Sequence, residues 1–288
     1  MTDPPPASPA LDPWFSVTTT VRNNASTIGP CLDSLEPQLR DGGELVVVDA
    51  LSTDGTAETL RSRSAANPRV RVLEEPGNRG VGRNRAAALA RGAILITNVD
   101  GDNRYEATVA RAAAERLRAS RPPLDLLLVI GAEDPDPSSG RFFVWRKEAF
   151  LRIGGYPARQ GLEDPEAVLK AFRGGLRVDR WVTPHVAEDL KPRRPGQAPS
   201  VPPWRRRRHA VRAARKFRII GYRYPEFVRY LWISRRTVPR FLAGMVVAAV
   251  AYLEAAASGN SVAFLTEDEE DAHVVRELAA ERRAEKAA

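Results

Sequence analysis

Short apolar runs alternate with amphipathic and polar stretches along the first two thirds of the chain. Each run has the length of a strand, and residues 44–48 are apolar almost throughout, which is typical of a strand covered on both faces of a parallel sheet. Turn and cap residues follow the first run, and we expect a helix to begin near Ile28. The predicted strands are 15–21, 44–48, 69–73, 93–99, 124–130, 141–145 and 176–182, and further helices are predicted at 56–65, 80–91, 106–119, 147–152 and 166–173.

This alternation predicts the fold class. Strands and helices that follow one another at short spacing form an α/β fold with a doubly wound, mostly parallel sheet flanked by helices. In open sheets of this kind, ligands bind at the carboxyl ends of the strands. Candidate chemistry is therefore expected in the residues that directly follow each predicted strand.

The apolar run that begins at Ile94 ends in two carboxylates one residue apart, Asp100 and Asp102. Two hard oxygen donors at the end of a buried strand suit a hydrated divalent cation, and such a cation suits a diphosphate. The same residues also fit a simple polar turn, because Asp-Gly is a common turn dipeptide. The rest of the chain has to decide between the two interpretations.

Two widespread phosphate-binding motifs do not occur in the sequence. No Gly-x-Gly-x-x-Gly follows the first predicted strand, and the pair Gly80 and Gly82 is followed by Arg83 instead of a third glycine. No Gly-Lys-Ser/Thr loop occurs either. Hydride transfer and nucleoside triphosphate hydrolysis therefore lose most of their support.

Five further positions carry candidate chemistry, each with an ordinary alternative. Asp49 ends a strand and could accept hydrogen bonds from a nucleoside or cap a loop, and Arg83 could bind a diphosphate or be a solvated helix arginine. Glu163 and Asp164 open a helix, where carboxylates are favoured electrostatically whatever their role. His185 follows a proline and could be a third metal ligand or a surface residue.

The order of these positions resembles that of the inverting family-2 glycosyltransferases, which have the GT-A nucleotide-diphospho-sugar fold. The resemblance runs from Phe15 to about His185. Its blocks are residues 15–24; Val-Asp-Ala-Leu-Ser-Thr-Asp-Gly-Thr at 48–56; Asn-Arg-Gly-Val-Gly-Arg-Asn at 78–84; Asn-Val-Asp-Gly-Asp-Asn at 98–103; and residues 148–156 with Gly-Leu-Glu-Asp at 161–164.

The sequence departs from the family pattern at four positions. Arg22 and Asn24 differ from the usual loop after the first strand, Ala50 replaces the second acid of the hallmark block, and Pro165 follows the Glu-Asp pair. The change at Ala50 is expected to bear on the nucleotide preference. The change at Pro165 is expected to bear on the shape of the acceptor pocket.

The resemblance implies a role for each candidate residue. Val21, Asn23 and Asp49 would lie against the nucleoside, and Arg83 would touch the base or the diphosphate. Asp100 and Asp102 would hold the diphosphate through Mn²⁺ or Mg²⁺, with His185 as a tentative further ligand. Asp164 and Glu163 would be the catalytic residues, with Asp164 as the base.

These roles imply a metal-dependent, inverting transfer of a sugar from a nucleotide-diphosphate donor to a glycan or lipid-linked acceptor. The metal would stabilise charge on the leaving diphosphate, and the base would remove the proton of the attacking hydroxyl. One alternative is a sugar-phosphate nucleotidyltransferase, which would need a glycine-rich loop in place of residues 21–24. Another is a catalytically inactive relative whose basic segment is a binding module.

Charge separates the chain into two parts. The 288 residues carry a net charge of +8, but residues 191–240 hold 16 Lys/Arg and one acid, a local +15, so the remainder carries 8 − 15 = −7. The expected segments are a disordered lead-in (1–13), a catalytic domain (14–190), a proline-rich linker (191–203), a basic and apolar helical extension (204–265) and a charged tail (266–288).

The basic extension is expected to meet an anionic partner. Interleaved aromatics and the apolar run 241–253 suit a helix lying on an anionic membrane, whereas the run is shorter than the ~20 residues of a spanning helix. Packing against the catalytic domain is the alternative, and nucleic-acid binding is unlikely because no recognised motif occurs. With a single cysteine, Cys31, and no secretory signal, the expected location is the cytoplasmic face of the plasma membrane.

Overall fold

A computed structural model describes residues 12–132, 141–158, 163–191 and 221–233, together with residues 249, 250 and 253. The predicted charged tail lies outside the described residues, as do most of the lead-in and the linker. The basic extension is described only in part, mainly over residues 221–233.

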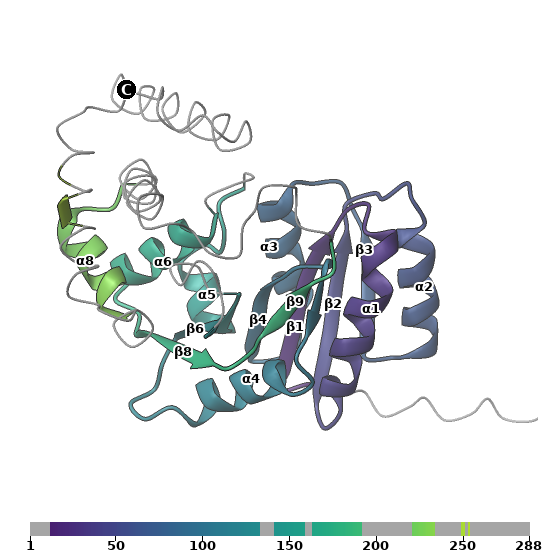
Figure 1. Ribbon diagram of the computed structural model, residues 1–288, viewed down its shortest axis with the longest axis horizontal. Helices are drawn as coiled ribbons and strands as arrows, with labels where there is room; N and C mark the ends of the chain where they lie inside the picture. The colour runs from purple at the N-terminus through teal and green to yellow at the C-terminus, as the bar shows by residue number, and fades with distance from the viewer. Residues whose placement is uncertain are drawn as a thin grey trace, which may run out of the picture.

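A seven-stranded sheet in the order β3-β2-β1-β4-β7-β6-β8 forms the centre of the molecule (Figure 1). Only β7 runs antiparallel to its neighbours, and every other pairing in this sheet is parallel. The predicted α/β fold with a mostly parallel sheet is therefore confirmed. The strands are β1 (Phe15–Val21), β2 (Gly43–Asp49), β3 (Val70–Glu74), β4 (Ile94–Val99), β6 (Leu126–Gly131), β7 (Phe142–Arg146) and β8 (Val178–Thr183).

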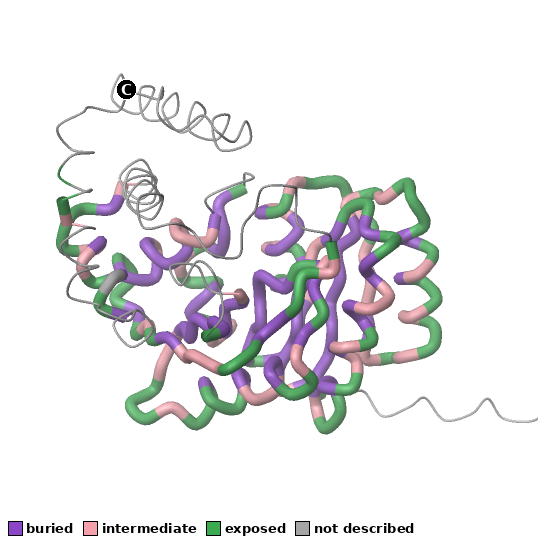
Figure 2. The backbone as a smooth tube through the Cα atoms, in the orientation of Figure 1, coloured by how far each residue is buried: buried purple, intermediate pink, exposed green. Residues whose placement is uncertain are grey.

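Helices cover both faces of the sheet, and alternate residues of each strand enter two separate hydrophobic cores. In β2, Val46 and Val48 belong to one core while Leu45 and Val47 belong to the other, which explains the uninterrupted apolar run. Figure 2 shows the central strands as mostly buried. One core is covered by α3 (Arg79–Leu89), α5 (Lys147–Arg152), α6 (Glu163–Arg173) and α8 (Tyr224–Ile233), and the other by α1 (Ala25–Leu35), η1 (Glu36–Leu39), α2 (Thr56–Ala66) and α4 (Val109–Ala119).

Most predicted elements lie within three residues of the observed ones. Helix α1 begins at Ala25 instead of Ile28, because the backbone carbonyl of Asn24 already accepts hydrogen bonds from the amides of Thr27 and Ile28. The prediction missed a small antiparallel ribbon of β5 (Asn103–Tyr105) and β9 (Ala187–Asp189). These strands have three residues each, too few to show an alternating pattern.

Helix α8 lies in the predicted basic extension and packs on the catalytic domain. Tyr222, Phe227 and Tyr230 are buried in the same core as α6. Figure 1 shows α8 beside α6, at the end of the molecule away from α2. For residues 221–233, packing against the domain is thus what the structure shows.

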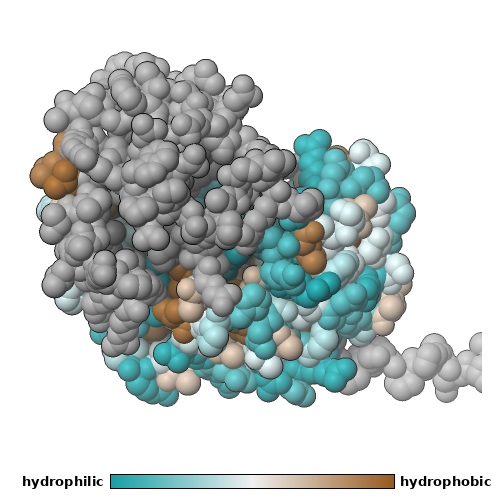
Figure 3. Space-filling model, in the orientation of Figure 1, coloured by the Kyte–Doolittle hydropathy of each residue, from teal (hydrophilic) through white to brown (hydrophobic). Residues whose placement is uncertain are grey.

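No helix among the described residues has both the length and the apolar character needed to cross a membrane. On the face drawn in Figure 3, the described surface is mainly hydrophilic, with small separate hydrophobic areas.

Candidate active site

The carboxyl ends of β1, β2 and β4 meet at one edge of the sheet. Val21, the last residue of β1, pairs with Asp49, the last residue of β2, and β4 leads directly into Asp100. Two glycines allow close packing at this edge. A Cβ on Gly82 would lie 2.3 Å from the Thr20 hydroxyl, and one on Gly101 would lie 2.6 Å from Val21. Helix α3 and the acidic loop can therefore approach β1 closely.

Arg83 joins the two acidic groups that the sequence separates by some sixty residues. Its guanidinium is 2.9 Å from an oxygen of Asp164 and 3.4 Å from oxygens of both Glu163 and Asp100. Only 5% of the Arg83 side chain is exposed, and it lies over the ring of Tyr156 at 5.5 Å. The alternative of a solvated helix arginine is therefore wrong.

Burial and charge oppose each other within this cluster. Burial acts to lower the pKa of Arg83, but Asp164 and Asp100 outweigh it and raise the pKa, so the guanidinium stays charged. Burial raises the pKa of Asp164, and the ion pair with Arg83 limits the rise. A carboxylate with a raised pKa binds a proton more readily, and 31% of the Asp164 side chain remains open to solvent. These properties suit a general base.

The loop after β4 presents Asp100 and Asp102, and contacts with Tyr105 and Cys31 hold it in place. The amide of Asp100 donates to the Tyr105 hydroxyl at 2.8 Å, and the Cys31 thiol lies 3.6 Å from the Asp100 carbonyl. The Asp100 side chain is 53% exposed, and Asp102 is 34% exposed and 3.1 Å from the Lys191 ammonium. Two accessible carboxylates on one turn fit a hard divalent cation that takes its other ligands from phosphate and water.

The structure does not bring His185 to this pair. In the ribbon, Asn103 pairs with Asp189 and Tyr105 pairs with Ala187, so Asp102 lies next to Leu190 at one end. His185 is exposed beyond the other end, five residues from Leu190, or roughly 16 Å along an extended chain. Over the described ranges, no three His, Cys, Asp or Glu side chains gather as metal ligands. The tentative assignment of His185 as a ligand is therefore not supported.

The residues predicted to border the nucleoside lie together, but Asp49 is already occupied. Its side chain is fully buried, and its two oxygens accept hydrogen bonds from the amide and hydroxyl of Ser52 at 3.0 and 2.5 Å. Asn23, in the left-handed region at φ 54°, holds the same loop through Ser52 and Thr53. Asp49 and Asn23 thus shape the loop beside Val21, as the loop-capping alternative predicts.

Two site residues escaped the sequence prediction. The Tyr156 hydroxyl lies 2.6 Å from the Thr97 hydroxyl, and the Tyr156 backbone is bound on both sides by the Asn84 amide at 2.8 and 2.9 Å. The ring thereby forms the floor beneath Arg83. Asn98 is buried beside Asp164. The Gly-Gly-Tyr end of the fifth block was the available signal for Tyr156.

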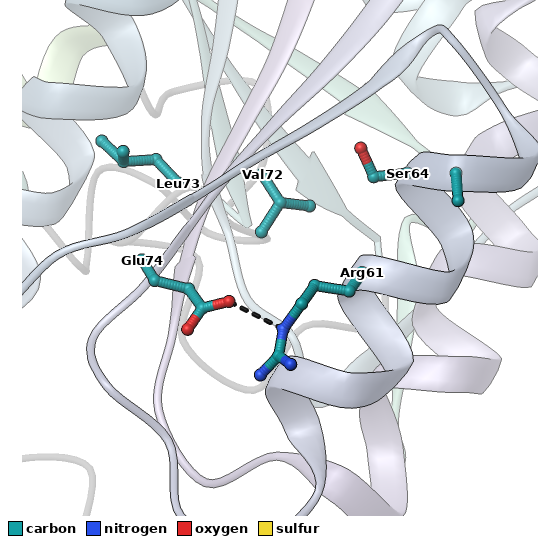
Figure 4. A pocket seen from close by; sticks show the side chains of 6 residues that line it. Arg61, Ser64, Val72, Leu73 and Glu74 are labelled. Atoms are coloured by element: carbon teal, nitrogen blue, oxygen red, sulfur yellow. Dashed lines mark hydrogen bonds and ion pairs between the residues drawn. The ribbon is translucent and has the colours of Figure 1, made fainter.

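A hollow between α2 and β3 has no part in this chemistry. Figure 4 shows that its walls include an ion pair of 2.9 Å between Arg61 and Glu74. None of the candidate catalytic or metal-binding residues lines it.

Comparison with known proteins identifies the domain. The model of the family described as "Glycosyl transferase family 2" matches residues 16–156. Residues 16–156 are a family-2 glycosyltransferase domain. The match contains Asp49, Arg83 and the pair Asp100 and Asp102, and it ends at Tyr156. Asp164 lies outside the matched residues, and Arg83 connects it to the family-2 domain.

A curated protein and two solved structures resemble the chain. The lipopolysaccharide core biosynthesis glycosyltransferase LpsC of Rhizobium meliloti (strain 1021) is 32% identical over 98 residues, which cover 34% of this chain and 35% of LpsC, about a third of its length. The mannosyltransferase PcManGT from Pyrobaculum calidifontis, solved with GDP-Man and Mn²⁺, has a TM-score of 0.60 at 25% identity, covering 94% of this chain and 81% of its own.

The second structure shows the fold alone. Residues 1–349 of TarS from S. aureus, solved with UDP, give a TM-score of 0.52 at 17% identity, with 85% of this chain and 90% of that chain covered. Beyond the family-2 domain, both similarities support the GT-A type of sheet.

Proposed function

We propose that the protein is a metal-dependent, inverting glycosyltransferase that moves a sugar from a nucleotide-diphosphate donor to an acceptor hydroxyl or lipid phosphate. The observation that carries the proposal is the position of Arg83, which joins Asp100 of the acidic loop to Asp164 at the start of α6. This contact supports a single site in which the leaving group would be bound and the acceptor proton removed. The bound GDP-Man and Mn²⁺ of PcManGT support the same donor class.

Asp100 and Asp102 would hold Mn²⁺ or Mg²⁺ with the donor diphosphate. When bound, the cation supplies Lewis-acid stabilisation of the negative charge that develops on the diphosphate. The Lys191 ammonium neutralises part of the charge of Asp102, and the Arg83 guanidinium does the same for Asp100. Both side chains are close enough to the loop to face a diphosphate bound on it.

Asp164 would take the proton of the attacking acceptor. Its raised pKa and its exposed fraction allow it to receive a proton from a hydroxyl in solvent contact. A single displacement from the face opposite the diphosphate inverts the anomeric carbon. Glu163 is 3% exposed and is paired with Arg79 and Arg83, so its role is to hold the arginines and not to meet the substrate.

The Asp164→Asn variant tests this assignment. We expect its turnover with the preferred nucleotide sugar to fall by roughly a hundredfold or more, because the amide accepts no proton. Donor affinity in the presence of Mn²⁺, measured by calorimetry over UDP and GDP sugars, should change little. Glu148→Gln, at the exposed start of α5, is the matched control and should keep full turnover.

Two outcomes would change the proposal. Unchanged turnover in Asp164→Asn would remove Asp164 from the mechanism. Donor binding in the wild type that does not depend on metal would favour an inactive relative or another mechanism.

We further propose that the acceptor is a cell-envelope glycan or a lipid-linked glycan, and that the basic extension brings the chain to the cytoplasmic face of the plasma membrane. The name of LpsC, a lipopolysaccharide core enzyme, supports an envelope acceptor. The local charge of +15 in residues 191–240 supports an anionic surface.

A further inference from the structure

One residue of β4 is displaced from the regular ladder beside the site. Along the pairing with β1, Val17 faces Ile96 and Thr19 faces Val99, so two steps in β1 correspond to three in β4. The extra residue produces a β-bulge, and Asn98 lies within it in the left-handed region at φ 63°. Bulges of this kind turn a side chain away from its regular direction.

The bulge is fixed on both sides of Asn98. The hydroxyl of Thr97 is bound to that of Tyr156 at 2.6 Å, and the carbonyl of Val99 accepts a hydrogen bond from the Thr19 hydroxyl at 2.5 Å. Asn98 therefore has no freedom to relax its backbone without breaking these contacts. An asparagine is one of the few residues other than glycine that adopts this conformation readily.

The side chain of Asn98 is buried without satisfying its polar atoms. Only 2% of the residue is exposed, and neither Oδ1 nor Nδ2 has a hydrogen-bond partner of ordinary geometry among the described residues. Leaving a buried amide in this state is destabilising. A buried polar group without a partner among the described residues calls for a partner in another state of the site.

The Asn98 amide neighbours the proposed base, Asp164. Burial raises the pKa of Asp164, Arg83 lowers it, and the neighbouring Asn98 amide lowers it further. The two groups are thus close but not yet aligned. Arg83 holds one Asp164 oxygen at 2.9 Å, which leaves the second oxygen for another donor.

We propose that Asn98 is a positioning residue for Asp164: its amide N–H completes a hydrogen bond to the carboxylate when the substrate is bound and points the free oxygen at the acceptor. The inference rests on the proposed function. Binding of a donor diphosphate would draw Arg83 towards the negative charge of the diphosphate and weaken the ion pair between Arg83 and Asp164. A neutral donor from the rigid bulge then keeps the carboxylate oriented without adding a second positive charge.

Two substitutions separate this role from a structural one. Asn98→Gly keeps the backbone conformation and removes the amide, and Asn98→Asp keeps the shape but places a second carboxylate against Asp164. Wild type, both variants, Asp164→Asn and the double variant Asn98→Gly/Asp164→Asn are compared. The measurements are acceptor-independent hydrolysis of the preferred UDP or GDP sugar with Mn²⁺, donor affinity by calorimetry, and the melting temperature.

We expect kcat to fall at least about tenfold in Asn98→Gly and further in Asn98→Asp, while donor KM and Kd stay within about threefold of wild type. The melting temperature of Asn98→Gly should not fall, since the variant removes an unsatisfied buried group. Adding Asn98→Gly to Asp164→Asn should cause no further loss of residual hydrolysis.

Other results overturn the inference. A kcat within twofold of wild type in Asn98→Gly, with Asp164→Asn inactive, rejects the role of Asn98 alone. A further loss in the double variant shows that Asn98 acts independently of Asp164. Full hydrolysis in Asp164→Asn rejects the proposed base, and with it the function on which the inference rests.

Discussion

Arg83 is the residue on which the charge balance of the site depends. Its buried guanidinium faces three carboxylates, from Asp100, Glu163 and Asp164. Removing one member of a buried ion group leaves the others uncompensated, which costs more than the intact group contributes.

The Arg83→Gln variant is expected to lose roughly 3–5 kcal/mol in the free energy of unfolding and to bind the donor more weakly. Chemical denaturation and calorimetry with a nucleotide sugar measure the two effects. Arg83→Lys is the matched control, because it keeps the charge but cannot span three carboxylates with one planar group. It should recover part of the stability and little of the affinity. Equal stability of wild type and Arg83→Gln would contradict the charge-balance argument.

At the residue scale, the sequence predicts candidate site residues more readily than the residues that contact them. Asp100, Asp102 and Asp164 were predicted because carboxylates at strand and helix ends form a recognisable order along the chain. The contact between Arg83 and Asp164 spans 81 positions and needs the fold to reveal it. Asn98 gave no signal, because an unsatisfied amide is visible only when its surroundings are known. His185 was a candidate ligand by residue type alone, and the register of the ribbon, which places it away from Asp102, is not visible in the sequence.

At the scale of elements, α8 completes the core that supports the proposed base. The Tyr222 hydroxyl donates to the carbonyl of Pro165 at 2.7 Å, one residue after Asp164. Phe227 and Tyr230 fill the space beside α6. A segment predicted as an appendage thus supports the first turn of α6, which carries the proposed base.

Phe227→Ala tests the contribution of α8. Phe227 is 3% exposed, so its truncation should cost roughly 3–5 kcal/mol in the free energy of unfolding. Trp232→Ala on the same helix is the control, because Trp232 is 54% exposed and its loss should change the stability by less than about 1 kcal/mol. Similar costs for both substitutions would show that α8 does not pack as described.

Glu226 makes the joint between α6 and α8 sensitive to acid. Burial acts to raise the pKa of Glu226, but the two hydrogen bonds from Arg173, at 2.9 and 3.1 Å, and those from Arg223 outweigh it and lower the pKa to about 2. A carboxylate whose pKa is lower in the folded chain stabilises the fold above its unfolded value of 4.5 and loses that effect as the pH falls towards 2.

Glu226→Gln should therefore be less stable than wild type by about 1–2 kcal/mol at pH 7, after allowance for the solvent exposure of the arginines. The difference between the two proteins should shrink between pH 5 and pH 2 as Glu226 becomes protonated. Urea unfolding at a series of pH values measures it. A difference that stays constant over this range would exclude the ion pairs as its cause.

Elements were predictable where burial on both sheet faces left a continuous apolar run, as in β2 and β6. The ribbon of β5 and β9 was not, because its pairing links residues 82 to 86 positions apart through polar sequence. Helix α8 was hidden because the arginines in and around it indicate a solvated charged segment, whereas Arg229 stacks its guanidinium on the ring of Phe172, with 4.5 Å between the guanidinium carbon and the ring centre.

At the scale of the whole molecule, the charge is divided between an acidic remainder and a basic segment. Deleting residues 204–257 would remove most of the Lys and Arg residues of the basic segment, but it would also remove α8. The matched variant therefore replaces Arg205 to Arg208 with glutamine in the full chain. We expect the full chain to float with vesicles rich in anionic lipid and the four-fold variant to float less, because each cationic side chain near such a surface contributes about 1 kcal/mol.

Neutral vesicles and high salt serve as controls in the same experiment. Both should abolish flotation if charge is the cause. Equal flotation of the two proteins on neutral vesicles would point to the apolar run 241–253 instead.

The ribbon of β5 and β9 has a consequence for engineering the chain. The amide of Leu190 donates to the carbonyl of Asp102 at 2.8 Å, and Lys191 reaches the Asp102 carboxylate, so the loop that carries Asp100 and Asp102 is in register with the end of β9. Extra residues near His185, beyond the paired positions, leave this register unchanged. One residue inserted between Asp189 and Lys191 would move both partners of Asp102. A linker or tag should therefore be inserted near His185, before β9. A fusion that shortens the chain at Leu190 would alter the loop that carries Asp102, although the two positions are almost ninety residues apart in the sequence.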